Sequence, residues 1–140
     1  MRNYLLFAVV LLCNVAAHAQ QKGYYRYPAI YQNTVVFTAE GDLWTYDISS
    51  GKTARLTTHA GMESVPCFSV DGKQIAFVGQ YEGPSELYVM PSEGGIPRRI
   101  TYDGSAVYPS GFLQNGKILF RSNLYTQIET PQLFTIDSVS

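Results

Sequence analysis

The sequence predicts an all-β protein built from a repeated four-stranded unit. Three observations lead to this class. Short stretches rich in aromatic and β-branched residues alternate with turn signals, the same order of strands returns along the chain, and no convincing helical period follows residue 20. With 46% hydrophobic and 14% aromatic residues among 140, the chain is expected to be globular and not disordered.

The first segment has the pattern of a signal peptide. Arg2 supplies a positive charge, residues 4–15 form an apolar stretch, and Ala17-His18-Ala19 is a cleavage site of the small-x-small type. We therefore expect residues 1–19 to be removed, Gln20 to become the N-terminus, and the protein to be exported to the periplasm or secreted. The apolar stretch is shorter than the ~20 residues of a membrane-spanning helix, so no stable membrane insertion is expected.

Residues 20–140 contain three copies of one pattern, and each copy opens with a strand that leads into a turn. The opening strands are expected at residues 27–31, 65–69 and 108–112. Two of the turns are Asp71-Gly72 and Asn115-Gly116, which favour tight hairpins because both central positions adopt positive φ. The second strands begin at Val35, Ile75 and Ile118, which are 40 and 43 residues apart. This is the spacing of a four-stranded propeller blade.

Third and fourth strands complete the unit. The third strands are expected at residues 42–46, 86–90 and 132–136, and the fourth at 53–57 and 97–101. A sandwich of unrelated hairpins is the alternative, but it would not return the turn, the aromatic strand and Arg-apolar-Thr in the same order. The sequence therefore predicts a partial β-propeller of about two and a half blades over residues 20–140. The blades are placed at residues 24–58, 63–102 and, incomplete, 106–140.

The second copy resembles the propeller repeat of the TolB and tricorn protease families. The resemblance is carried by Asp71-Gly72-Lys73-Gln74-Ile75-Ala76-Phe77, Leu87-Tyr88-Val89-Met90, Gly94-Gly95 and Arg98-Arg99-Ile100-Thr101. Near the N-terminus, Tyr25-Arg26-Tyr27-Pro28-Ala29-Ile30 and Glu40-Gly41-Asp42-Leu43-Trp44 are similar to the start of tricorn proteases. The similarity covers residues 23–137, with departures at 112–116 and 123–131.

This resemblance implies the first blades of a six-bladed propeller, followed by a second propeller and a distant peptidase region with a serine nucleophile and a histidine base. It predicts that the segment guides or gates peptides for an exported serine peptidase, with the catalytic residues outside this chain. Peptides or unfolded polypeptides are the expected partners, and assembly of identical chains stays open. A non-enzymatic TolB-like module that binds a partner protein is the main alternative. A propeller attached to a prolyl-oligopeptidase-like enzyme is another.

The chemistry of the segment itself offers no catalytic, metal or cofactor site. After loss of Arg2, nine Lys and Arg stand against eleven Asp and Glu, so nucleic acid is not an expected partner. One cysteine, Cys67, then remains, and it is expected to be a buried structural thiol. One histidine, His59, also remains, and it is expected to be a solvated loop residue because most polar loop residues have no catalytic role.

The other candidates also favour structural roles. Ser110 lacks the Gly-x-Ser-x-Gly elbow of a nucleophile and is expected on an inner strand. Glu40 and Asp42 fit a turn and the entry to a strand better than a metal site. Gly94-Gly95 fits a turn because no Lys-Ser continuation or helix follows it. Trp44 and the tyrosines are expected to pack between blades, with a peptide-binding channel as the alternative.

The last expectation concerns the C-terminus. The third copy reaches residue 137 without a fourth strand, so Ser140 is expected to be a break within a longer protein. Propellers close a ring with about four to eight blades. An open arc is therefore expected to leave Phe77, Tyr88 and Phe120 partly in water.

Overall fold

The computed structural model describes residues 23–123 and 130–138, which form three antiparallel sheets. The first sheet contains β1 (Arg26–Tyr31), β2 (Thr34–Ala39), β3 (Asp42–Asp47) and β4 (Lys52–Arg55). The second contains β5 (Glu63–Phe68), β6 (Gln74–Gly79), β7 (Glu86–Pro91) and β8 (Arg98–Arg99). The third contains β9 (Val107–Phe112), β10 (Lys117–Ser122) and β11 (Gln132–Asp137). No helix occurs in these residues, which confirms the all-β class.

Some predictions lie outside the described residues. These are the signal peptide at 1–19, the new N-terminus at Gln20, and most of the departure at 123–131. In the part of the chain that is described, no helix is long and apolar enough to cross a membrane.

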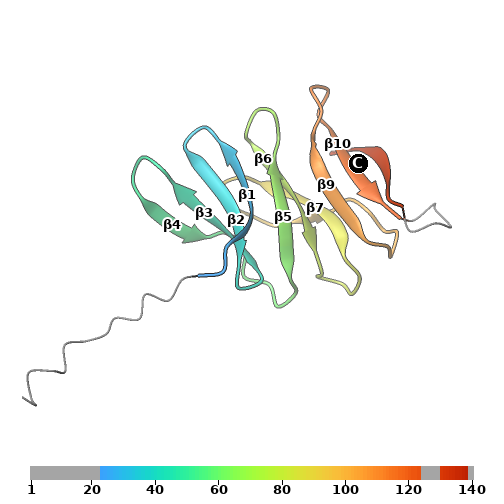
Figure 1. Ribbon diagram of the computed structural model, residues 1–140, viewed down its shortest axis with the longest axis horizontal. Helices are drawn as coiled ribbons and strands as arrows, with labels where there is room; N and C mark the ends of the chain where they lie inside the picture. Colours follow the sequence, from blue (N-terminus) through green and yellow to red (C-terminus); the bar gives the residue numbers. More distant parts are fainter. Residues whose placement is uncertain (1–22, 124–129, 139–140) are drawn as a thin grey trace, which may run out of the picture.

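The sheets stand side by side and meet through their first strands. In each sheet the strands follow chain order from one edge to the other, as consecutive hairpins do. β5 lies against β1 on one side and against β9 on the other, whereas β4 and β8 lie at the far edges of their sheets (Figure 1). The first strand of each sheet is therefore the inner strand of its blade.

The second sheet is buried on both faces, which explains its nearly continuous apolar strands. Side chains alternate between the two faces of a strand. Ile75 and Phe77 on β6 therefore face the first sheet, where they join Val36 and Leu43. The residue between them, Ala76, faces the third sheet instead. The seam between the first and second sheets also includes Tyr88 and Met90, and the seam between the second and third includes Leu87, Val89, Ile100, Val107, Ile118 and Phe120.

One expectation about exposure is wrong. Phe77, Tyr88 and Phe120 are buried, with exposed fractions of 0%, 3% and 6%. The reason is that these three side chains lie in the seams between described sheets and not on the free outer faces. The large apolar side chains that do meet water lie elsewhere, for example Tyr46 on β3 and Leu133 on β11.

The turn between β5 and β6 fixes how closely the first two sheets approach. Gly72 has φ +71°, and a Cβ added to it would lie 2.1 Å from the Tyr31 ring at the end of β1. Glycine is therefore required here both by the backbone conformation and by the neighbouring blade. The Asp-Gly signal that marks the hairpin in the sequence also serves the contact between blades.

Candidate functional site on the inner strands

The three inner strands share a backbone irregularity. In β1 and in β5 the register with the next strand shifts between Arg26 and Ala29 and between Ser64 and Cys67. Tyr27 and Val65, the first residues in these bulges, have φ of 51° and 52°, and each precedes a proline. Positive φ is a marked outlier for a β-branched residue such as Val65. A β-bulge locally redirects side chains and leaves a residue without a ladder partner.

The third inner strand has the same irregularity in a different form. Pro109 pairs with Phe120 and Gly111 pairs with Leu119, so Ser110 is left between them without a partner in the ladder. All three bulges lie at or next to the proline of the inner strand.

Three exposed aromatic or apolar side chains lie on the inner strands. Tyr27, Ile30 and Tyr108 are 47%, 62% and 40% exposed. The register places Ile30 on the same face as Tyr46 and Tyr108 on the same face as Leu133, so both lie on the free faces of the first and third sheets.

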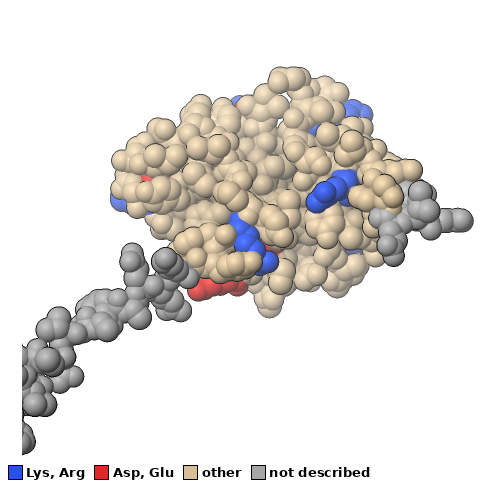
Figure 2. Space-filling model, in the orientation of Figure 1, with Lys and Arg blue, Asp and Glu red and all other residues tan. Residues whose placement is uncertain are grey.

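The two tyrosines make cation–π contacts. The Arg26 guanidinium lies 5.7 Å from the centroid of the Tyr27 ring, and the Arg121 guanidinium lies 5.0 Å from that of the Tyr108 ring. The face that includes these strands is mostly uncharged, with a few separate basic groups and an acidic group at its lower edge (Figure 2).

A second apolar surface lies on the free face of the first sheet. A cavity of about 560 Å³ opens there, lined in part by Tyr25, Phe37, Trp44 and Tyr46. Tyr25 meets Phe37 edge to face with ring centroids 5.3 Å apart. The Trp44 indole donates a hydrogen bond to the carbonyl of Ala39 at 3.1 Å. Trp44 therefore lies on this free face and not on an inner strand.

His59 lies between β4 and β5, and it is exposed. Its Nδ1 accepts a hydrogen bond from the Gly61 amide at 2.9 Å, and its ring centroid lies 4.3 Å from that of Tyr81. His59 thus has structural partners in its own loop and in the connection between β6 and β7.

The other candidate residues lie on different strands and connections. Ser110 is exposed on β9. Cys67 on β5 is half-buried against the seam between the second and third sheets, and burial raises the pKa of its thiol to about 12. Gly94 and Gly95 both have positive φ in the connection after β7. Within residues 23–123 and 130–138, no group of three or more His, Cys, Asp or Glu could hold a metal ion.

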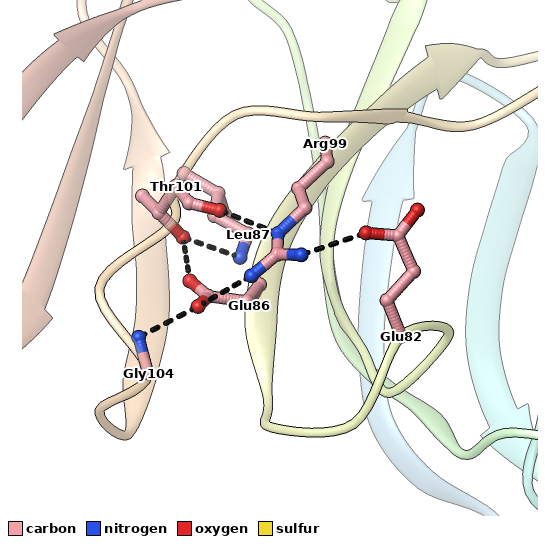
Figure 3. A network of polar contacts seen from close by, with 6 residues as sticks. All are labelled: Glu82, Glu86, Leu87, Arg99, Thr101 and Gly104. Atoms are coloured by element: carbon pink, nitrogen blue, oxygen red, sulfur yellow. Dashed lines mark hydrogen bonds and ion pairs between the residues drawn. The ribbon is translucent and has the colours of Figure 1, made fainter.

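A polar network that the sequence did not reveal ties β7 and β8 to the connection that leads to the third sheet (Figure 3). Glu86, fully buried at the start of β7, accepts hydrogen bonds from Arg99 at 2.9 Å, from the Gly104 amide at 2.8 Å and from the Thr101 hydroxyl. Burial alone would raise the pKa of Glu86, but hydrogen bonds from Thr101, Gly104 and Arg99 outweigh it and hold the pKa below its usual value. Glu86 is therefore an ionised, fully partnered carboxylate.

The first seam carries a related network with one change. Asp42 at the start of β3 pairs with Arg55, as Glu86 pairs with Arg99. Thr57 donates its hydroxyl hydrogen not to Asp42 but to Glu63 on β5, at 2.8 Å. The side chain of Asp42 is one methylene shorter than that of Glu86. The carboxylate that accepts from Thr57 is therefore supplied by Glu63 of the next blade.

The sequence signal for both networks was the Arg-apolar-Thr motif that marks the fourth strand. The register of the sheets places each arginine opposite the strand that begins with the acidic residue: Arg55 pairs with Trp44, and Arg99 pairs with Tyr88. The motif therefore marks the arginine that pairs with Asp42 or Glu86 as well as the repeat itself.

Comparison with known proteins agrees with this architecture. The profile of the tricorn protease N-terminal β-propeller domain matches residues 22–140. A tricorn protease homolog 1 from Streptomyces coelicolor is 32% identical over 97 residues, 69% of this chain and 9% of its own length. A tricorn protease homolog from Saccharolobus solfataricus is 30% identical over 116 residues, 78% of this chain and 10% of its own length. The chain thus spans about a tenth of these two relatives.

Solved structures show the same fold. The crystal structure of the tricorn protease superimposes with a TM-score of 0.72 at 23% identity, covering 81% of this chain and 12% of that one. TolB from Acinetobacter baumannii superimposes with a TM-score of 0.70 at 21% identity, covering 82% of this chain and 30% of that one. The three sheets are therefore β-propeller blades that form part of a ring, as the repeat predicted.

Proposed function

Because this chain belongs to the tricorn protease N-terminal β-propeller family, we propose that it supplies the first blades of a propeller that guides peptides to a serine peptidase active site. The catalytic residues lie outside these 140 residues in this proposal, and the protein is exported by the signal peptide at residues 1–19. Peptides or unfolded polypeptides are the ligands.

The observation that carries the proposal is the surface of the inner strands. Propeller blades surround a central channel, and the first strand of each sheet lies nearest its neighbours. Tyr27, Ile30 and Tyr108 expose apolar area on these strands, Ile30 and Tyr108 on the free faces of the first and third sheets, and Arg26 and Arg121 contact the tyrosine rings by cation–π interaction. Tyrosine gives a large contact area at a small cost in side-chain entropy.

The backbone of the inner strands supports the same function. The bulges leave residues such as Ser110 outside the ladder, so their backbone groups are free of strand pairing and can bond to an extended peptide. Contacts to a peptide backbone do not depend on its sequence. The arrangement therefore suits transit of many peptides better than selection of one.

Peptide hydrolysis by the full-length protein tests this function. Tyr108→Ala and Tyr27→Ala should each raise KM for long peptides by about twofold to tenfold, with kcat unchanged, because one aromatic contact is worth ~0.5–1.5 kcal/mol. Short reporter peptides that do not span the channel should be hydrolysed at the original rate.

The matched control is Tyr102→Ala. Tyr102 is exposed and also lies over an arginine, with Arg99 4.5 Å from its ring centroid, but it belongs to the connection after β8 and not to an inner strand. Its loss should leave KM unchanged. If all three variants behave alike, or if the full-length protein hydrolyses no peptide, the proposal is wrong.

A further inference from the structure

The first two sheets are joined at one residue by both its backbone and its side chain. Glu63, the first residue of β5, donates its amide hydrogen to the Gly41 carbonyl at 2.7 Å, and its side chain accepts the Thr57 hydroxyl hydrogen at 2.8 Å. Glu63 is fully buried. Both partners belong to the first blade or to the connection that leaves it, so Glu63 fastens the inner strand of the second blade to the first.

The equivalent residue at the next seam is apolar. Glu63 follows Thr57 by six residues, and Val107 follows Thr101 by six. Both residues open an inner strand and both are fully buried. At that seam one buried carboxylate, Glu86, meets Arg99, Thr101 and Gly104, and Arg99 also pairs with the exposed Glu82. The first seam therefore holds two buried carboxylates where the second holds one.

Two buried oxygens at the first seam, Asp42 Oδ1 and Glu63 Oε1, accept no hydrogen bond of ordinary geometry, although the Tyr81 hydroxyl lies near enough to Glu63 to lower the pKa of its carboxyl. Their other oxygens are engaged, Asp42 Oδ2 by Arg55 and Glu63 Oε2 by Thr57. An unpaired buried acceptor is costly, and two adjacent buried carboxylates cannot both ionise without strong repulsion. One proton between the two free oxygens would remove both costs.

We propose that Asp42 and Glu63 share one proton across the seam between the first two blades, and that loss of this proton to water loosens the seam. The proton resides on Glu63, and its O–H donates to Asp42, which also contacts Arg55. The shared proton makes the contact between these blades tighter at mildly acidic pH and weaker at alkaline pH.

The surroundings of the pair support this assignment. Burial raises the pKa of Glu63 to about 7; hydrogen bonds from Thr57 and Tyr81 oppose the shift, and the negative charge of Asp42 adds to it. Arg55 contacts Asp42 with its own side chain 46% exposed. Tyr88 on β7 and His59 both pack against Tyr81, with ring centroids 4.6 Å and 4.3 Å from that of Tyr81.

The direction of the pH dependence follows from the raised pKa. A carboxyl that titrates near 7 when the seam is closed, and near its usual value when it is open, binds the proton more tightly in the closed state. Its contribution to closure is complete below the usual pKa and is lost as pH rises through about 7. Between pH 6 and pH 8.5 the closed seam should weaken on the order of tenfold.

Amide hydrogen exchange of the full-length protein tests the proposal. The reporter is the Glu63 amide, which bonds to Gly41, and the internal control is the Ile100 amide, which bonds to Leu87 within the second blade. After correction for the intrinsic rate, protection of the residue 63 amide should fall on the order of tenfold from pH 6 to pH 8.5, while that of Ile100 should not fall.

Matched variants separate this pair from other groups. Glu63→Gln keeps the shape, can donate from its amide nitrogen to Asp42 and accept from Thr57, and should abolish the pH dependence while keeping the protection seen at pH 6. His59→Asn is the control, because histidine is the other residue type that titrates near neutral pH, and it should leave the dependence intact.

Two results would overturn the proposal: a pH dependence that persists in Glu63→Gln, or one that disappears in His59→Asn. If Glu63→Gln does not fold, infrared spectroscopy of the unsubstituted protein decides. A buried carboxylic acid band that titrates near pH 7 and is absent from Asp42→Asn supports proton sharing. Absence of such a band at pH 6 contradicts it.

Discussion

The clearest energetic prediction concerns Glu86 at the second seam. Glu86→Ala removes the acceptor of three hydrogen bonds, from Arg99, Thr101 and Gly104. Arg99, whose side chain is 15% exposed, then has only one carboxylate partner, the peripheral Glu82, which is 66% exposed. Removing one partner of a buried pair costs about 3–5 kcal/mol. Since a domain of this kind has a net stability of about 5–15 kcal/mol, the loss should be large.

Urea denaturation of the full-length protein measures this loss, with the midpoint and slope fitted separately. Lys73→Ala is the control: it breaks the pair between Lys73 and Asp71, 3.7 Å apart with side chains 81% and 58% exposed, and exposed pairs contribute less than about 1 kcal/mol. If Glu86→Ala lowers the free energy of unfolding no more than Lys73→Ala does, the network does not stabilise the second blade. If Glu86→Ala does not fold, Glu86→Gln gives a smaller loss of the same sign.

The pH dependence at this seam should be opposite to that at the first. The pKa of Glu86 lies below its usual value in the folded protein. Its stabilisation is therefore present above the usual pKa and is lost as pH falls through the folded value. Unfolding below pH 4 should be less steep in Glu86→Gln than in the unsubstituted protein.

Three further predictions concern the export signal, the core and the cysteine. Signal peptidase should cleave after Ala19, so intact-mass measurement of exported protein should show Gln20 as the first residue, and retention of Met1 would contradict it. Phe77→Ala, at a fully buried position in the first seam, should cost about 3–5 kcal/mol in urea denaturation, whereas Ile30→Ala on the free face of the first sheet should cost less than about 1 kcal/mol. Cys67, whose thiol has a pKa of about 12 because of burial, should react with a thiol reagent at pH 8 only after unfolding, and rapid labelling of the native protein would refute its burial.

The sequence predicted the strands well because each one carries a local signal. Turn dipeptides such as Asp71-Gly72 define hairpins over a few residues, and alternating apolar strands such as β6 follow directly. The inner-strand bulges also had a local sign, since a proline lies in each of them.

The seams could not be predicted in the same way because they depend on contacts between sheets. Glu63 looks like an ordinary polar residue at the start of a strand, and only the approach of β5 to the first blade buries it beside Asp42. The prediction that Phe77 is partly exposed is wrong for the same reason, since the sequence does not say which face of its strand meets a neighbouring sheet.

Site-specific photo-crosslinking tests the central claim, that peptides pass along the inner strands. A benzoylphenylalanine placed at Tyr108 in the full-length protein should capture a labelled substrate peptide on irradiation, and excess unlabelled peptide should prevent capture. The same photo-reactive residue at Tyr102, which is exposed at 73% but lies on the connection after β8, should capture little. Equal capture at both positions, or none at Tyr108 while the peptide is hydrolysed, would contradict the claim.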